Sequence, residues 1–113
     1  GAGVDIDGPL TNKGNATVDG KATGGEGVEL SGPITGGTVN GTSDSGSGIK
    51  VDGESSLNNA TLNGTSPNGK GVEVTANLSG NHGSAVRGDT ANGTGVDVAP
   101  NVALVGGGAD DLL

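Results

Sequence analysis

Apolar and polar residues alternate in five short segments of the chain that resemble one another. Each segment opens with glycine and continues apolar, polar, apolar, as in GVDI and GVEL. The segments start at Gly3, Gly27, Gly48, Gly71 and Gly95, with spacings of 24, 21, 23 and 24 residues. Alternation predicts a strand with one buried face. A nearly fixed spacing predicts a repeat architecture, in which stacking of neighbouring copies supplies the core.

A second apolar position recurs in each full copy, inside ATVDG, GTVNG, ATLNG and SAVRG. From this position, ten residues lead to the next copy without insertions or deletions. Because equivalent strands recur at a constant period, each strand can stack on the equivalent strand of the next copy. The sequence therefore predicts an all-β fold, a right-handed parallel β-solenoid (β-helix) with about 23 residues per coil. We expect one domain over residues 1–113, with four full coils, a partial fifth coil and a mobile tail at 106–113.

Stacking of this kind places equivalent side chains in ladders about 4.8 Å apart. The pattern predicts three inward ladders: Val4, Val28, Ile49, Val72 and Val96; Ile6, Leu30, Val51, Val74 and Val98; and Val18, Val39, Leu62 and Val86. Between the first two ladders lies an outward column of Asp5, Glu29, Lys50, Glu73 and Asp97. We interpret this column as a solvated face on which Lys50 relieves the repulsion between stacked acids.

Composition narrows the classes of function. The 113 residues include 26 Gly and no Phe, Trp, Tyr, Met or Cys, so the core must come from aliphatic and hydroxyl side chains and disulfides are excluded. The formal net charge of −8 disfavours nucleic acid and anionic membranes as partners. No apolar run approaches membrane-spanning length, so membrane insertion is not expected.

Three kinds of chemistry find little support. The only histidine, His82, lies in a polar loop without a triad or a cluster of carboxylates, so we expect no enzyme activity and no cofactor. GGEGVEL at 24–30 resembles a calcium-binding nonapeptide repeat, but that motif works by recurring every nine residues, and here it returns only after about 23, so no metal site is expected. Thr17, Thr38 and Thr61 form a column of the kind that can match ice, but Ala85 and Arg87 interrupt it and its neighbour.

Asn-x-Ser/Thr sequons occur six times, where composition alone would give about two. One interpretation is N-glycosylation on the surface, and the other is that Asn, Gly and Thr only form turns and strands. Asn40 and Asn63 stack in one column, so we expect them to carry sugar first. The candidate glycosylation sites are Asn15, Asn40, Asn59, Asn63, Asn77 and Asn92.

Tandem coils of the type GVxVxGxLT…ATVxGxTxxGxG, rich in Asn, Gly, Thr and Ser and without Cys, resemble the passenger repeats of filamentous-haemagglutinin-like exoproteins over about residues 3–105. These are large bacterial adhesins exported by two-partner secretion, and the sequons resemble the EtpA-type members that are glycosylated before export. The resemblance implies a β-helix, export through an outer-membrane partner, a secreted or cell-surface location and a role in virulence through host attachment.

Three functions remain open. The first is a rigid stalk and repetitive contact surface of a secreted adhesin, with a host surface protein or glycan, and antibodies, as partners. Its contact strip would consist of Thr17, Thr38, Thr61, Asn40 and Asn63. The second is a purely structural spacer that binds nothing itself, and the third is an ice-binding solenoid.

Overall fold

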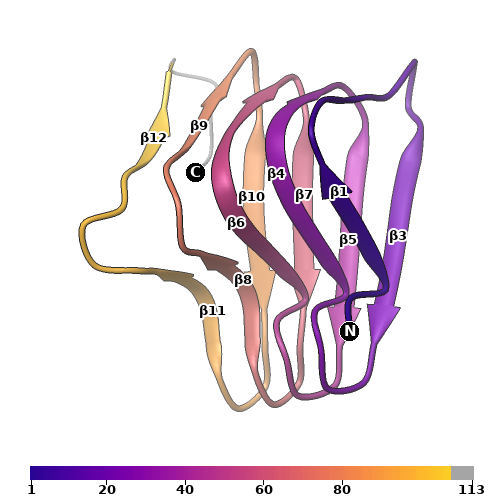
Figure 1. Ribbon diagram of the computed structural model, residues 1–113, viewed down its shortest axis with the longest axis vertical. Coiled ribbons are helices and arrows are strands. Elements are labelled where there is room, and N and C mark those ends of the chain that lie inside the picture. Colours follow the sequence, from indigo (N-terminus) through magenta and orange to yellow (C-terminus); the bar gives the residue numbers. More distant parts are fainter. Residues whose placement is uncertain (108–113) are drawn as a thin grey trace.

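The computed structural model describes residues 1–107, and within that range it contains strands and loops but no helix. The chain winds into four full coils and a partial fifth, and each full coil crosses a front and a back sheet once (Figure 1). The front sheet contains β1 (Val4–Asp7), β2 (Leu10–Thr11), β4 (Val28–Thr35), β6 (Ile49–Asn58), β8 (Lys70–Val74), β9 (Leu78–Asn81), β11 (Thr94–Val98) and β12 (Leu104–Gly106). The back sheet contains β3 (Thr17–Ala22), β5 (Thr38–Ser43), β7 (Thr61–Thr65) and β10 (Ala85–Asp89).

Within residues 1–107 all paired strands are parallel, as the predicted stacking requires. In Figure 1 the front strands run upward and the back strands downward, while the chain advances from the N-terminus on the right towards the left. Seen from the amino-terminal end this path is clockwise and recedes from the viewer. The molecule is therefore the right-handed parallel β-solenoid that the sequence predicts.

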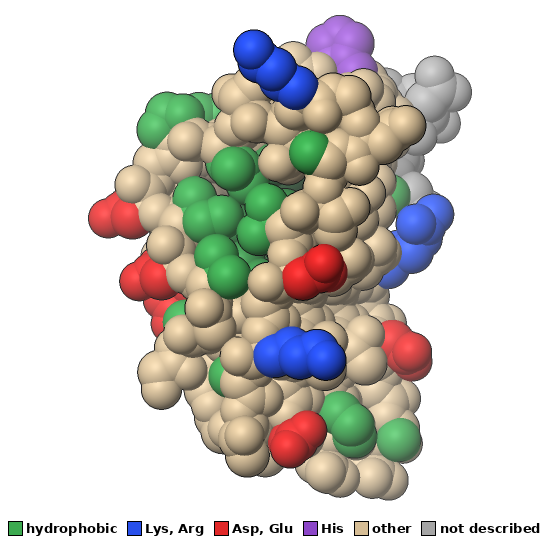
Figure 2. All heavy atoms as spheres, turned by 90° about the vertical axis from the view of Figure 1, so that its right-hand side faces the viewer, with side chains coloured by type: hydrophobic (Ala, Val, Ile, Leu, Met, Phe, Trp, Pro, Cys, Tyr) green, Lys and Arg blue, Asp and Glu red, His purple; other side chains and the backbone are tan. Residues whose placement is uncertain are grey.

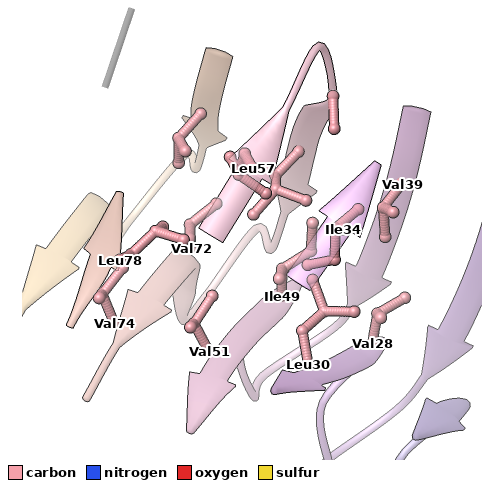
Figure 3. Close-up of a cluster of buried hydrophobic side chains, with 13 residues drawn as sticks. Val28, Leu30, Ile34, Val39, Ile49, Val51, Leu57, Val72, Val74 and Leu78 are labelled. Atoms are coloured by element: carbon pink, nitrogen blue, oxygen red, sulfur yellow. The ribbon is translucent and has the colours of Figure 1, made fainter. Parts of the chain in front are cut away.

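The register of the three predicted inward ladders is confirmed, although Val96, in the last copy of the first ladder, is 37% exposed. Val28 pairs with Val4 and Ile49, and Ile49 with Val72, while Leu62 of the third ladder lies between Val39 and Val86. In the middle coils these side chains are fully or almost fully buried and point into the space between the sheets (Figure 3). Each fully buried aliphatic side chain contributes about 1.5–3 kcal/mol of hydrophobic stabilisation, so a core without aromatics suffices when every coil repeats it.

A further apolar residue follows the first strand of each full copy, at Leu10, Ile34, Leu57 and Leu78, but these four residues do not all stack in one column. Leu57 lies beside Ile34 and Gly80, whereas Leu78 lies beside Ser55 and Leu104. The shift begins in β6, which carries two more residues than β4 between the paired positions, so the register changes between Leu30 and Gly32. Both leucines remain buried because the two columns are both inward-facing, two residues apart.

The recurring glycine of the back strands is required by close packing against the next corner. At Gly41, Gly64 and Gly88 a Cβ atom would collide with the carbonyl oxygen of Gly48, Gly71 and Gly95, respectively. A side chain of any size is therefore excluded at this position, and the glycine is a packing requirement of the coil.

The amino-terminal end of the solenoid is open. Figure 2 shows apolar side chains uncovered at the amino-terminal end, where Val4, Ile6, Leu10 and Val18 are only partly buried. At the other end the sequence predicted a tail from residue 106, but Gly106 belongs to β12 and Gly107 donates a backbone hydrogen bond to Gly80 at 2.7 Å. The rest of that tail lies outside the described residues.

Candidate functional site

The expected contact strip lies on the outer face of the back sheet. Thr17, Thr38 and Thr61 are in register, and Asn40 and Asn63 form the neighbouring outward column with Asp19. Thr17 is exposed, while the other members of the strip are half-buried between adjacent coils. The structure therefore brings together all five residues of the strip in two adjacent columns of one polar surface.

Amide side chains in this strip bind one another. Asn63 Nδ2 donates to Asn40 Oδ1 at 3.1 Å, and Asn40 Nδ2 donates to Asp19 Oδ1 at 3.0 Å. This asparagine ladder ties three coils together and orients each amide along the solenoid axis. Each of these amide nitrogens donates one of its two N–H groups, so the second N–H and the threonine hydroxyls are the polar groups that the strip offers to a partner.

The next strand, β10, is the last strand of the back sheet and carries one basic and one acidic side chain, both exposed. Arg87 pairs with Asn63, and Asp89 follows two residues later, so both side chains point outward from the same strand. Both are exposed, and they lie about 6–7 Å apart along the strand. Gly88 between them is the packing glycine of the repeat.

Sequence reasoning missed this pair because it treated Arg87 only as an interruption of the asparagine column. The sequence does contain a signal for the pair, because Arg87 and Asp89 are oppositely charged and two residues apart in a predicted strand, with Gly88 between them. The repeat itself explains the glycine, so the informative positions are the two charged residues on either side of it.

The six sequon asparagines lie in different environments. Asn40, Asn63 and Asn92 each donate through Nδ2, Asn92 to Asn68 Oδ1 at 3.0 Å. Asn77 accepts from the backbone of Ala103 through Oδ1 at 2.9 Å. Asn15 and Asn59 are exposed beside the turns that lead into β3 and β7, and their side chains make no hydrogen bond within the described residues. The geometry thus favours Asn15 and Asn59 over Asn40 and Asn63 as sites of modification.

The charged column on the front sheet is in the predicted register, but Lys50 is not its main counter-ion. Lys50 Nζ lies 4.0 Å from Glu26 Oε1, whereas Lys70 Nζ lies 3.2 Å from Glu73 Oε2 and 2.7 Å from Asp97 Oδ2. Hydrogen bonds to Asp97 and Glu73 raise the pKa of Lys70. Lys70 precedes the repeated segment by one residue, so the alternation pattern did not single it out.

The pKa values of two acids in this column are shifted in opposite directions. Burial alone would raise the pKa of Glu73, but hydrogen bonds from Ser47, at 2.7 Å, and Lys70 outweigh it and lower that pKa. Burial, with a contribution from neighbouring Asp52, raises the pKa of Glu29. Glu29 and Asp52 border an acidic depression of about 360 Å³. Within residues 1–107, no group of three or more acidic, histidine or cysteine side chains has the geometry of a metal site.

His82 lies in the loop between β9 and β10, exposed and with a left-handed backbone at φ 61°. The described residues include no helix long and apolar enough to cross a bilayer. Comparison with known protein families, with curated proteins and with solved structures finds no match.

Proposed function

We propose that this chain is a repeat segment of a secreted bacterial adhesin that serves as a rigid stalk and presents a contact surface to a host protein. The observation that carries the proposal is the outward-facing pair of Arg87 and Asp89 beside the polar strip. An exposed cation and anion on one strand can engage two complementary groups of a partner at once.

The chemistry of the pair indicates the kind of receptor. A guanidinium binds a carboxylate through two parallel hydrogen bonds, and a carboxylate is a preferred ligand of Mg²⁺ and Ca²⁺. A receptor that offers an acidic side chain to Arg87 and a bound divalent cation to Asp89 would match both.

The solenoid supports attachment in two further ways. β10 is held along its length by β7, so little conformational entropy is lost when the pair binds a partner. The contact strip has no aromatic anchors of the kind that usually concentrate binding energy, so repetition along a longer fibre would supply avidity. The same repetition would make the strip a good antibody target.

The wider setting follows from the resemblance described above. A secreted or cell-surface location, virulence and export through an outer-membrane partner are parts of the same proposal. The alternative is a structural spacer, favoured by the internal satisfaction of the asparagine ladder. Ice binding would use the regular column of Thr17, Thr38 and Thr61 and is tested by thermal hysteresis.

Attachment of animal cells to surfaces coated with the purified chain tests the proposal. We expect attachment that requires Mg²⁺ or Mn²⁺, is abolished by EDTA and falls at least about fivefold in Asp89→Glu, which keeps the charge but moves the carboxylate. The matched control is Asp44→Glu, at an exposed corner position, which should attach as the parent chain does. Absence of attachment, or equal attachment by both variants, would favour the spacer.

A further inference from the structure

A groove of about 390 Å³ crosses the outer face of the front sheet, on the opposite side of the solenoid from the contact strip and Arg87. It is lined by Gly32, Pro33, Glu54, Ser55, Ser56, Asn77, Leu78, Ser79, Ala103 and Val105. These residues come from four successive coils. The groove therefore runs along the solenoid axis, and its volume falls within the range of small-molecule sites.

The groove forms where the strands of the front sheet change direction. In β6 the register shifts after the residue opposite Leu30, and in the following coils the strand is interrupted between Val74 and Leu78 and between Val98 and Leu104. The groove is lined at these places by Gly32, Ser55, Asn77 and Ala103. It thus lies where β6 carries its two extra residues and where the front strands of the next two coils are interrupted.

The floor of the groove is a single outward-facing column of residues, one from each coil. Pro33 pairs with Ser56, Ser56 with Ser79, and Ser79 with Val105. Three coil spacings of about 4.8 Å make this column about 14 Å long. A ligand that follows the floor must therefore be elongated, with a repeat close to the length of one sugar residue.

The lining offers several hydrogen-bonding groups between apolar patches. The side chains of Glu54, Ser56 and Ser79 make no hydrogen bond within the described residues. Asn77 accepts from Ala103 through Oδ1, which leaves its amide N–H groups to donate. Pro33 and Val105, which is 51% exposed, provide apolar surface at the two ends of the floor. Hydroxyl, amide and carboxylate groups among small apolar patches suit a ligand with many hydroxyl groups and C–H faces.

An extended peptide fits this groove poorly. The strands cross the groove at right angles to its length, and the backbone of the central strands is paired with the coils on either side. No strand edge runs along the groove for a peptide to extend. The carboxylate of Glu54 and the net charge of −8 also disfavour anionic polymers.

We infer that this groove binds a neutral linear oligosaccharide lying parallel to the solenoid axis. Side chains of Glu54, Ser56, Ser79 and Asn77 contact its hydroxyl groups, and Pro33 and Val105 contact its C–H faces. Because no aromatic ring stacks on the sugars, each residue of the ligand contributes little, and binding requires several consecutive residues. The inference does not rest on the proposed attachment through Arg87 and Asp89, since the two sites lie on different sheets.

Titration of the ¹⁵N-labelled chain with neutral tetrasaccharides tests the inference by NMR. The probes are cellotetraose, maltotetraose and chitotetraose, each with its disaccharide, and tetragalacturonate as the anionic counterpart. We expect at least one neutral tetrasaccharide to shift the backbone amides of Ser56, Ser79 and Val105. Its dissociation constant should be at least about threefold lower than that of its disaccharide, and tetragalacturonate should not bind.

Two lysine substitutions in the same coil provide the matched comparison. Ser56→Lys fills the centre of the groove and should raise the dissociation constant at least about tenfold. Thr65→Lys makes the same change of charge on the back sheet, in the column that already contains Lys21, and should leave it within about twofold. The inference is overturned if none of the neutral probes shifts these amides at millimolar concentration, if the two variants bind alike, or if tetragalacturonate binds as well as the neutral sugars.

Discussion

The hydroxyl group of Ser66 donates a hydrogen bond to the carbonyl oxygen of Gly46, one coil earlier, at 2.6 Å. It also accepts one from the backbone N–H of Gly69 at 3.1 Å, and the side chain is fully buried. Ser43 makes the equivalent pair of bonds with Gly25 and Gly46. The small residue at this corner of the repeat therefore carries a hydroxyl group that joins successive coils. Of the four full coils, the first has Ala22 at this position and lacks the hydroxyl group.

Replacement of this hydroxyl should destabilise the solenoid. Ser66→Ala leaves the Gly46 carbonyl and the Gly69 N–H without their partner in a buried corner, at a cost of about 1–3 kcal/mol. Urea unfolding followed by circular dichroism measures the change. Ser56→Ala, at an exposed position of the same coil, should change the free energy of unfolding by less than about 0.5 kcal/mol. Equal effects would show that the corner hydroxyl is dispensable.

The glycines of the back strands should differ sharply from other glycines in their tolerance of alanine. In Gly64→Ala the new methyl group meets the carbonyl oxygen of Gly71, and we expect a loss of about 3 kcal/mol, at the upper end of the range for overpacking. Gly24→Ala is the control, because the nearest atom to its Cβ is Ser45 Oγ at 3.9 Å. Thermal unfolding of the two variants side by side gives the comparison, and similar midpoints would contradict the packing argument.

Substitutions at two adjacent residues test which side chains of the front strands face inward and which face outward. Val51 is fully buried, so Val51→Asp places an unpaired carboxylate in the core at a cost of several kcal/mol and should unfold the chain. Lys50→Glu puts a third acid between Glu29 and Glu73 on the solvated column and should cost about 1 kcal/mol or less. Unfolding midpoints in urea decide the matter; if they coincide, the assignment of inward and outward faces is wrong.

The fold could be predicted from the sequence because the repeat contains two regularities, the alternation within each strand and the spacing between copies. The alternation in GVDI and its relatives fixes which side chains face inward, and the constant spacing fixes which of them stack, so the ladders through Ile49 and Leu62 followed directly. The register of Leu78 could not be predicted, because it depends on how β6 accommodates its extra residues.

The candidate sites were predicted less completely, for two physical reasons. Contacts such as that of Lys70 with Asp97 join residues far apart in the chain and depend on the reach of flexible side chains, which a strand pattern does not encode. The axial groove lies at a register shift and at strand interruptions, which depend on the lengths of insertions rather than on the repeat itself. The pair of Arg87 and Asp89, by contrast, could have been identified from the sequence, but it lies in a copy that departs from the others.

Stability should depend on pH through Glu73 and Glu29 with opposite signs. The pKa of Glu73 is lowered from its ordinary value of 4.5, so its stabilisation is complete above that value and is lost as the pH falls through its folded-state pKa. The pKa of Glu29 is raised, so its ionised form penalises the folded state at neutral pH, and acidification relieves this penalty. Glu73→Gln should therefore lower the unfolding midpoint at pH 7, and Glu29→Gln should raise it.

Both differences should disappear once the pH has fallen below the folded-state pKa of each carboxyl group, because each is then protonated in the folded and unfolded chains. Thermal unfolding of the parent chain and the two variants across this range measures the effect. A difference that persists unchanged at low pH would show that packing, and not ionisation, distinguishes these side chains.

Sugar transfer to the folded chain should follow the hydrogen bonds of the asparagines and not the stacking of the sequons. Transfer requires a free Nδ2, and in Asn40 and Asn63 this nitrogen already donates to a neighbouring coil, whereas Asn15 and Asn59 are exposed beside turns. Incubation of the folded chain with a soluble N-glycosyltransferase that recognises Asn-x-Ser/Thr, followed by peptide mass mapping, should find sugar first on Asn15 and Asn59.

Two comparisons make this prediction decisive. Unfolding the chain in urea and presenting its peptides to the enzyme should remove the difference between the sites, because the ladder no longer exists. Asp19→Ala removes the acceptor of the Asn40 amide and should increase transfer to Asn40 in the folded chain, while Asn63, whose acceptor Asn40 is intact, should stay protected. Rapid transfer to both ladder asparagines in the folded parent chain would show that these hydrogen bonds open too readily to protect the side chains.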